Sequence, residues 1–278
     1  MEDCCLSMKK SLSIFMMLLI YMGGRGAQGV CVKDERTALL EIKASLHEYF
    51  PDVDNLLSSW VDHGRTSGEC CEWERIKCDK VTGHVTDLSL SNLLSEDYES
   101  FYDRTWPLDF SPFIHFKELR NLDVSWNYID DTFVGKGVER LSSLKKLETL
   151  NLSNNRIETN IFPSLASLVS LKILDLSNMK GYESYDPSST AHDIFEFSTL
   201  KNLEVLDLTG CGCYGTLQMQ GSEKLSILKK LKILILGDNQ FNESLLSSLS
   251  VHQSLESLDL SHNDVRSIPF EGIYIYLN

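Results

Sequence analysis

The apolar positions of this chain recur in a pattern that fits neither a helix nor a long strand. In the segment LETLNLSNNRI, apolar residues stand at Leu147, Leu150, Leu152 and Ile157, with Asn155 between the last two. A helix would repeat its apolar residues every 3.6 positions, and a strand would alternate them for longer. The pattern predicts instead a short strand that buries Leu150 and Leu152, followed by a bend at which Asn155 caps buried backbone groups.

The same frame, L-x-x-L-x-L-x-x-N-x-L, returns along most of the chain. Copies begin at Leu119, Leu147, Leu171, Leu203, Leu231 and Leu255, with a weaker first copy at Val85. The central strand leucines of these copies are Leu88, Leu122, Leu150, Leu174, Leu206, Leu234 and Leu258. Asp, Ser and Asn recur at fixed offsets from them, which chance leucine periodicity in an amphipathic helix does not explain.

This frame is the leucine-rich repeat, in which each coil has an apolar face that only a neighbouring coil can bury. The sequence therefore predicts an α/β repeat fold, a right-handed leucine-rich-repeat solenoid with a curved parallel sheet. The copies are 24 to 34 residues apart, as if one unit of 24 residues carried insertions of varying length.

The N-terminus has the pattern of a secretory signal peptide. Lys9 and Lys10 precede an apolar run from Ile14 to Met22, and small residues follow it. Cleavage is predicted after Gly29, with cleavage after Gly26 as the alternative. An uncleaved anchor is also open, although the apolar run is short for a permanent spanning helix.

Between the signal peptide and the first repeat, the sequence predicts a helical cap. In DERTALLEIKASL, four residues share one helical face: Ala38, Leu39, Ile42 and Leu46. Without a cap, the first coil would expose one end of the apolar stack. Four cysteines of this region allow three disulfide connectivities: Cys31, Cys70, Cys71 and Cys78. A zinc site from them is disfavoured, because the secretory compartment is oxidising and the adjacent pair is poorly spaced for ligation.

The block resembles the N-terminal cap of plant extracellular leucine-rich-repeat proteins. In that family a helical lead-in precedes a Cys-Cys-x-Trp element and a later Cys, here Cys70, Cys71, Trp73 and Cys78. The resemblance implies disulfides between Cys31 and Cys70 and between Cys71 and Cys78. The expected organisation is a signal peptide at 1–29, the cap at 30–84 and about seven repeats at 85–278, with insertions near 93–117 and 182–197 that form loops on one side of the solenoid.

The two residues that flank each central leucine are predicted to face the concave side of the sheet. Eight of them form a candidate ligand surface: the aspartates Asp123, Asp175, Asp207 and Asp259 and the apolar residues Ile173, Val205, Ile233 and Ile235. The acidic column suits a basic peptide or protein, and a structural role for Asp at this place is the alternative. The apolar residues form either a contact patch or a sheet face filled by β-branched side chains.

The residue after each leading leucine alternates in sign. This column reads Arg120, Glu148, Lys172, Glu204, Lys232 and Glu256. Because neighbouring strands lie about 4.8 Å apart, we expect opposite-charge pairs between coils that support the register, and no binding site.

Two successive coils depart from the repeat pattern. Cys211 stands at the Asn place of its coil and Cys213 at the next apolar place, so both are predicted to be buried free thiols. Met179 likewise replaces the Asn of the preceding coil, so the regular series of capping asparagines is in doubt there.

Asn151 and Asn242 begin N-x-S glycosylation acceptors, and a glycan on Asn151 would lie on the concave face.

Composition and motifs narrow the function. The formal charge is -14 with 24% charged residues, and without a basic stripe a nucleic-acid partner is excluded. The seven histidines are scattered, and we find no nucleophile elbow and no Gly-rich phosphate loop. We therefore expect no enzyme, no cofactor and no metal.

The cap and the repeats together resemble the N-terminal part of plant leucine-rich-repeat receptor-like proteins, which are cell-surface receptors without a kinase. The resemblance implies non-enzymatic recognition of a protein or peptide ligand in defence or developmental signalling, with a co-receptor kinase as a second partner. It places the chain in the secretory pathway, then at the extracellular face of the plasma membrane or in the apoplast.

Membrane attachment would come only from a C-terminal segment that this chain does not contain. Two other readings stay open: a secreted protein similar to the polygalacturonase-inhibiting proteins, and a truncated product without independent function. The truncated product is suggested because the last predicted coil leaves its apolar side uncovered.

Overall fold

The computed structural model describes residues 30–50, 53–62, 70–93, 105–130, 138–157, 161–179, 194–215, 228–243, 245, 249, 254–265 and 274–276. The predicted signal peptide lies outside these residues. So do residues 182–193 of the second predicted insertion and Ser244 of the second glycosylation acceptor.

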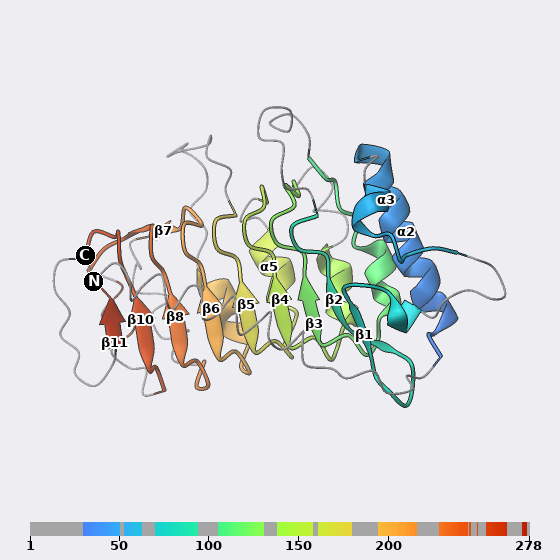
Figure 1. Ribbon diagram of the computed structural model, residues 1–278. Coiled ribbons are helices and arrows are strands. Elements are labelled where there is room, and N and C mark those ends of the chain that lie inside the picture. Colours follow the sequence, from blue (N-terminus) through green and yellow to red (C-terminus); the bar gives the residue numbers. More distant parts are fainter. Residues whose placement is uncertain are drawn as a thin grey trace.

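One curved sheet of nine strands runs along the molecule (Figure 1). Its strands, in spatial order, are β1 (Ile76–Cys78), β2 (Val85–Ser89), β3 (Asn121–Asp123), β4 (Thr149–Asn151), β5 (Ile173–Asp175), β6 (Val205–Asp207), β8 (Ile233–Ile235), β10 (Ser257–Asp259) and β11 (Tyr274–Tyr276). Only β1 is antiparallel to its neighbour; the other pairs are parallel. The fold is the predicted leucine-rich-repeat solenoid.

The seven central leucines stand side by side in this sheet, as predicted. Leu88 pairs with Leu122, and the register continues without a slip through Leu258. Each of them is at most 1% exposed. Because side chains alternate along a strand, the leucines fill the interior and their two neighbours face the other side.

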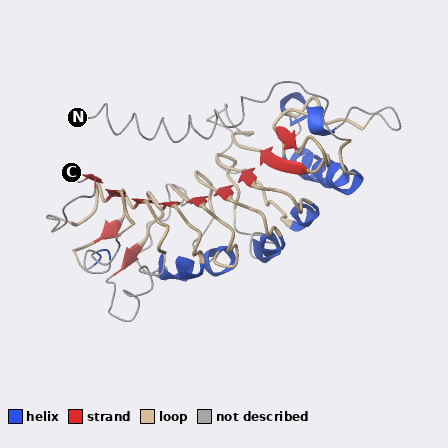
Figure 2. Ribbon diagram, turned by 90° about the horizontal axis from the view of Figure 1, so that it is seen from below, coloured by secondary structure: helices blue, strands red, loops and turns tan. Residues whose placement is uncertain are grey.

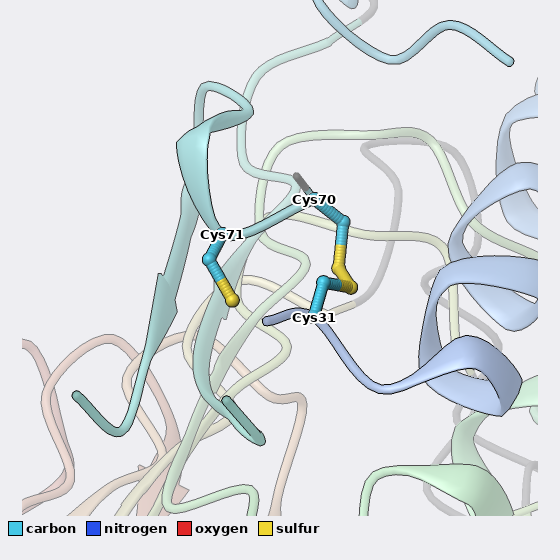
Figure 3. Close-up of side chains that lie close together, drawn as sticks. All are labelled: Cys31, Cys70 and Cys71. Atoms are coloured by element: carbon cyan, nitrogen blue, oxygen red, sulfur yellow. A yellow bond between two sulfur atoms is a disulfide. The ribbon is translucent and has the colours of Figure 1, made fainter. Parts of the chain in front are cut away.

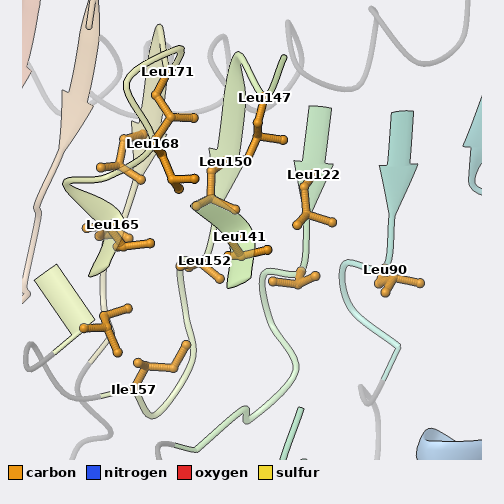
Figure 4. Close-up of a cluster of buried hydrophobic side chains, with 14 of the residues drawn as sticks. Leu90, Leu122, Leu141, Leu147, Leu150, Leu152, Ile157, Leu165, Leu168 and Leu171 are labelled. Atoms are coloured by element: carbon orange, nitrogen blue, oxygen red, sulfur yellow. The ribbon is translucent and has the colours of Figure 1, made fainter. Parts of the chain in front are cut away.

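Short helices cover the interior on the side opposite the sheet (Figure 2). They are the 3-10 helices η3 (Ser111–His115), η4 (Val138–Ser143) and η6 (Ile194–Thr199) and the α-helix α5 (Phe162–Leu165). Figure 4 shows Leu150 and Leu152 from the β4 coil beside Leu141 of η4 and Leu165 of α5. Leucines of adjacent coils thus share one continuous apolar interior, in which each coil is covered by the next.

Side-chain amides satisfy the backbone where the chain leaves the sheet. Asn155 donates from Nδ2 to the carbonyls of Val124, Leu152 and Ser153, and its Oδ1 accepts the N–H groups of Asn127 and Ile129. Three other asparagines make bonds of the same kind: Asn127, Asn239 and Asn263. Met179 and Cys211 interrupt this ladder, yet β5 and β6 stay in register with their neighbours.

The cap consists of α2 (Lys33–Tyr49), α3 (Val53–Leu56), the 3-10 helix η2 (Cys70–Glu72) and β1. The four predicted face residues of α2 are buried. Disulfides join Cys31 to Cys70 (Figure 3) and Cys71 to Cys78, which is the pairing implied by the resemblance. Trp60 stacks on Trp73 with ring centroids 5.8 Å apart, so the Cys-Cys-x-Trp element forms part of the cap's core.

A buried carboxylate ties the cap to the first repeat. Glu35 of α2 is fully buried, and its Oε2 accepts the N–H of Val85, the first residue of β2, at 2.8 Å. Its Oε1 lies 2.9 Å from Nδ1 of His84. Burial raises the pKa of Glu35 above its usual value, although the bonds to Val85 and His84 oppose the shift.

The insertion near 93–117 differs from the expected surface loop over its described part. Residues 105–117 pack into the interior, with Trp106, Leu108, Phe110, Phe113 and Phe116 at most 1% exposed. Phe113 contacts Phe110 and Phe116 at centroid distances of 5.4 and 6.0 Å. These aromatic residues fill the space that the repeat leucines leave unfilled between the cap and the first coils.

The prediction of free thiols at Cys211 and Cys213 was wrong. Both side chains are buried, as predicted, but they form a disulfide with each other. Gly210 and Gly212 have φ values of 59° and 66°, a left-handed conformation that glycine adopts readily. This turn brings the two cysteines onto the same side of the chain, with their Cα atoms 5.3 Å apart.

Two elements were not predicted. β11 adds a strand beyond the last predicted coil, in register with β10. A second, two-stranded sheet forms where β7 (Tyr214–Gly215) pairs with β9 (Gln240–Phe241) in two successive turns.

Candidate ligand-binding surface

The eight candidate residues lie in two parallel rows on the concave face of the sheet. The first row follows the position before the central leucine and contains Asn121, Thr149, Ile173, Val205, Ile233 and Ser257. The second row follows the position after it and contains Asp123, Asn151, Asp175, Asp207, Ile235 and Asp259. The register thus brings all the candidates except Asp123 onto the adjacent strands β5, β6, β8 and β10.

The four aspartates have a structural task in the turn that follows each strand. Asp123 Oδ1 accepts the N–H of Ser125 at 3.0 Å and its hydroxyl at 2.7 Å. Asp175, Asp207 and Asp259 make the same two bonds to Ser177, Thr209 and Ser261. This geometry supports the structural alternative for the acidic column. A carboxylate has acceptor positions beyond these two, so a ligand contact by the same residues stays a proposal.

Two of these carboxylates, Asp175 and Asp207, repel each other across adjacent strands. Burial, and next the repulsion by Asp207 on the adjacent strand, raise the pKa of Asp175 from 3.8 to about 7. The folded state therefore binds a proton on Asp175 more readily than the unfolded chain does. The free energy of unfolding should consequently fall as pH rises from about 4 to about 7.

We expect Asp175→Asn to stabilise the protein at pH 7.5 by about 1 to 3 kcal/mol and to flatten its stability profile between pH 4 and 7. Asn151 is the template, because its Oδ1 accepts the N–H of Ser153 at 2.9 Å in the same position of the β4 coil. Urea unfolding across this pH range measures the effect. Asp238→Asn, the same change at an exposed site, is the control, and equal profiles for the two variants would contradict the assignment.

The apolar candidates form one continuous patch. Ile173, Val205 and Ile233 are neighbours in register across β5, β6 and β8, and Ile235 follows on β8. All four are half-buried, so part of each side chain faces the concave surface. Three consecutive apolar residues in the first row, beside carboxylates in the second, give this part of the sheet an amphipathic face.

The column of alternating charges lies at the edge where the strands begin. Glu148 pairs with Arg120 at 2.9 Å and with Lys172 at 2.7 Å, and Glu204 pairs with Lys232 at 3.3 Å. These pairs are partly exposed, so each contributes no more than about 1 kcal/mol. They bridge adjacent coils, in agreement with the predicted register support.

The glycosylation acceptors occupy different surroundings. Asn151 is half-buried in β4, where its side chain faces the concave surface. Asn242 forms an isolated parallel bridge with Asp264. Attachment of a glycan at either asparagine stays a prediction.

An exposed tryptophan at the edge of the sheet was missed from the sequence. Trp126 is 58% exposed and has a φ of 59°, which is rare for a bulky side chain. The same place in other coils holds Asn92, Asn154, Asn178, Gly210, Asp238 and His262, also with positive φ. All of these types tolerate that conformation better than tryptophan. The signal was present in the sequence as V-S-W-N among L-S-N-N, L-T-G-C and L-S-H-N.

One cysteine cluster has the composition of a metal site. Among the described residues, only Cys31, Cys70 and Cys71 bring three possible ligand atoms within 4.8 Å of one another. Each of these sulfur atoms belongs to a disulfide, so none is available as a thiolate ligand. In the described part of the chain, no helix has the length and apolar composition to span a membrane.

Comparison with known families agrees with this architecture. The model described as leucine rich repeat N-terminal domain matches residues 32–79, and leucine-rich-repeat models match residues 139–181 and 254–274. The structure is similar to the crystal structure of PEPR1-AtPEP1, with a TM-score of 0.54 and 21% identity, covering 88% of this chain and 32% of that one. That likeness concerns the fold.

Curated relatives include Receptor like protein 21 of Arabidopsis thaliana, 32% identical over 77% of this chain and 20% of the relative. Receptor-like protein EIX1 of Solanum lycopersicum is 30% identical over 91% of this chain and 26% of the relative. The chain thus spans about a fifth to a quarter of the length of these two proteins. It is a leucine-rich-repeat protein that carries the family's N-terminal domain, and its homologues are plant receptor-like proteins.

Proposed function

We propose that this chain is a non-enzymatic extracellular recognition module of a plant cell-surface receptor-like protein, acting in defence or developmental signalling. Its ligand is an extended peptide or protein segment, and a co-receptor kinase is the second partner. The relatives, which are receptor-like proteins, support the class of function. Disulfides in the cap support an oxidising, extracellular location.

The observation that carries the proposal is the amphipathic face across β5, β6 and β8. The apolar patch of Ile173, Val205, Ile233 and Ile235 offers area for burial. Beside it, Asp175 and Asp207 repel each other, and a positively charged group of the ligand would relieve that repulsion. A ligand with apolar and basic side chains therefore fits this face best.

The proposal is tested by panning a library of random nonapeptides on the secreted, glycosylated protein. The retained peptides are then assayed on Val205→Arg, which places a bulky cation at the centre of the patch. We expect at least tenfold weaker binding to this variant. Val169→Arg is the matched control, because Val169 is 52% exposed in the turn between α5 and β5 and not on the concave face. Equal losses in both variants, or in neither, would contradict a concave binding site.

A further inference from the structure

The turn after β8 departs from the pattern of all its neighbours. After β3, β4, β5, β6 and β10, the last strand residue accepts the N–H of the residue two places on, at 2.9 to 3.0 Å. The strand residue is Asp or Asn and the donor is Ser or Thr. In the β8 coil the two places hold Ile235 and Gly237, so both the acceptor side chain and the hydroxyl are missing.

The consequence is an unused backbone donor. The side chain of Ile235 offers no oxygen, and the N–H of Gly237 has no hydrogen-bond partner among the residues that the structure describes. Gly237 is buried. Buried N–H groups without a partner are rare in native structures, and each calls for an explanation, such as a group that arrives from outside the fold.

The surroundings of this donor combine apolar and acidic groups. Ile235 pairs in register with Asp207 on one side and with Asp259 on the other. Gly237 has no side chain. A β-carbon placed on it would lie 3.1 Å from Ser261 Oγ and 3.6 Å from Asp259 Oδ1. The interruption thus forms an apolar centre with a main-chain donor, between two carboxylates.

We propose that the β8 coil is the anchoring subsite of the concave face. There Ile235, with Ile233 and Val205, receives an apolar side chain of an extended peptide, and the N–H of Gly237 donates to a main-chain carbonyl of that peptide. Asp207 and Asp259 contact basic side chains on either side of the anchor. This inference rests on the proposed function and adds the chemistry of the ligand.

Strand spacing sets the ligand pattern. Asp207 and Asp259 are two strands apart, roughly 9.6 Å at the usual interstrand distance. Alternate residues of an extended chain point to the same side and lie about 6.6 Å apart, so residues four positions apart span about 13 Å. A peptide with an apolar residue midway between two basic residues four positions apart presents all three side chains to the subsite, and its long basic side chains reach inward to Asp207 and Asp259. An acidic peptide would meet repulsion from both carboxylates.

The test uses the full secreted chain and a fluorescein-labelled peptide, Gly-Ser-Arg-Gly-Leu-Gly-Arg-Ser-Gly, with fluorescence anisotropy at pH 7.5. The key variant is Ile235→Asn, for which Asn151 is the template. This change supplies the missing acceptor to Gly237 and removes the apolar anchor without adding charge. We expect the variant to unfold at or above the wild-type temperature and to bind the peptide at least tenfold more weakly.

Two control peptides separate the contributions. Leu→Ser in the peptide should weaken binding to the wild type about as much as Ile235→Asn does, and Arg→Glu at both places should abolish it. Equal affinity of the wild type and Ile235→Asn, stronger binding of the acidic peptide, or no binding of the basic peptide would each overturn the inference.

Failure of this subsite can be distinguished from failure of the proposed function. If library peptides lose affinity for Val205→Arg but bind Ile235→Asn unchanged, the subsite is wrong and concave recognition stands. If they are insensitive to Val205→Arg as well, the proposed function fails.

Discussion

Replacing Asn155 by alanine is expected to lower the free energy of unfolding of its region by about 3 to 5 kcal/mol. The side chain makes five hydrogen bonds to buried backbone groups of two coils. Alanine leaves these groups without partners, and each unsatisfied buried group costs about 1 to 3 kcal/mol before relaxation. Urea unfolding followed by circular dichroism measures the loss.

The control for this variant is Asn202→Ala. Asn202 donates one bond to the carbonyl of Val169 and accepts one from Lys230, both exposed. It should cost less than about 1 kcal/mol. Similar losses for the two variants would show that the inward asparagine does not hold adjacent coils together.

The second large effect concerns Glu35. Its replacement by alanine removes the acceptor for the N–H of Val85 and the partner of His84, and we expect a loss of about 2 to 4 kcal/mol. The cap should detach from β2 before the repeats unfold, because this carboxylate joins α2 to the first repeat strand. Hydrogen exchange of the amides of residues 85–89 locates the effect.

Glu35→Gln separates charge from hydrogen bonding. It keeps one oxygen for Val85, so it should be less damaging than alanine. Because burial raises the pKa of Glu35, the folded state holds this proton more tightly, and its contribution to stability declines as pH rises above about 4.5. The glutamine variant should lack this decline. Glu41→Ala, an exposed change on the same helix, should leave the cap attached.

Much of the fold follows from side-chain spacing. The leucine marker at Leu88 and its six successors predicted the register of seven strands, because a shift of one residue would turn every leucine out of the core. The structural role of the aspartates also has a sequence pattern, since four of the strands end at the Asp of an Asp-x-Ser or Asp-x-Thr sequence. The column of aspartates predicted a structural role as one alternative, but the hydroxyl two places later was not predicted as the bonding partner.

Other features depend on contacts that no local pattern records. Trp106 and Phe110 fill the space between the cap and the repeats, and no repeating sequence pattern signals that packing. Glu35 looks like an ordinary first-turn acid of a helix, and its burial is set by β2, fifty residues away. The Cys211–Cys213 disulfide depends on the left-handed glycines beside it, and β11 lacks the leucine frame altogether.

Photo-crosslinking tests the central claim, that the concave ribbon of β5, β6 and β8 binds the ligand, most directly. A library-selected peptide carrying a benzophenone group is irradiated with the secreted protein, and the labelled residues are identified by mass spectrometry. We expect adducts at residues 173–175, 205–207 and 233–235. Adducts confined to residues 161–168 and 194–200, on the helical side of the coils, would contradict ligand binding by the concave ribbon.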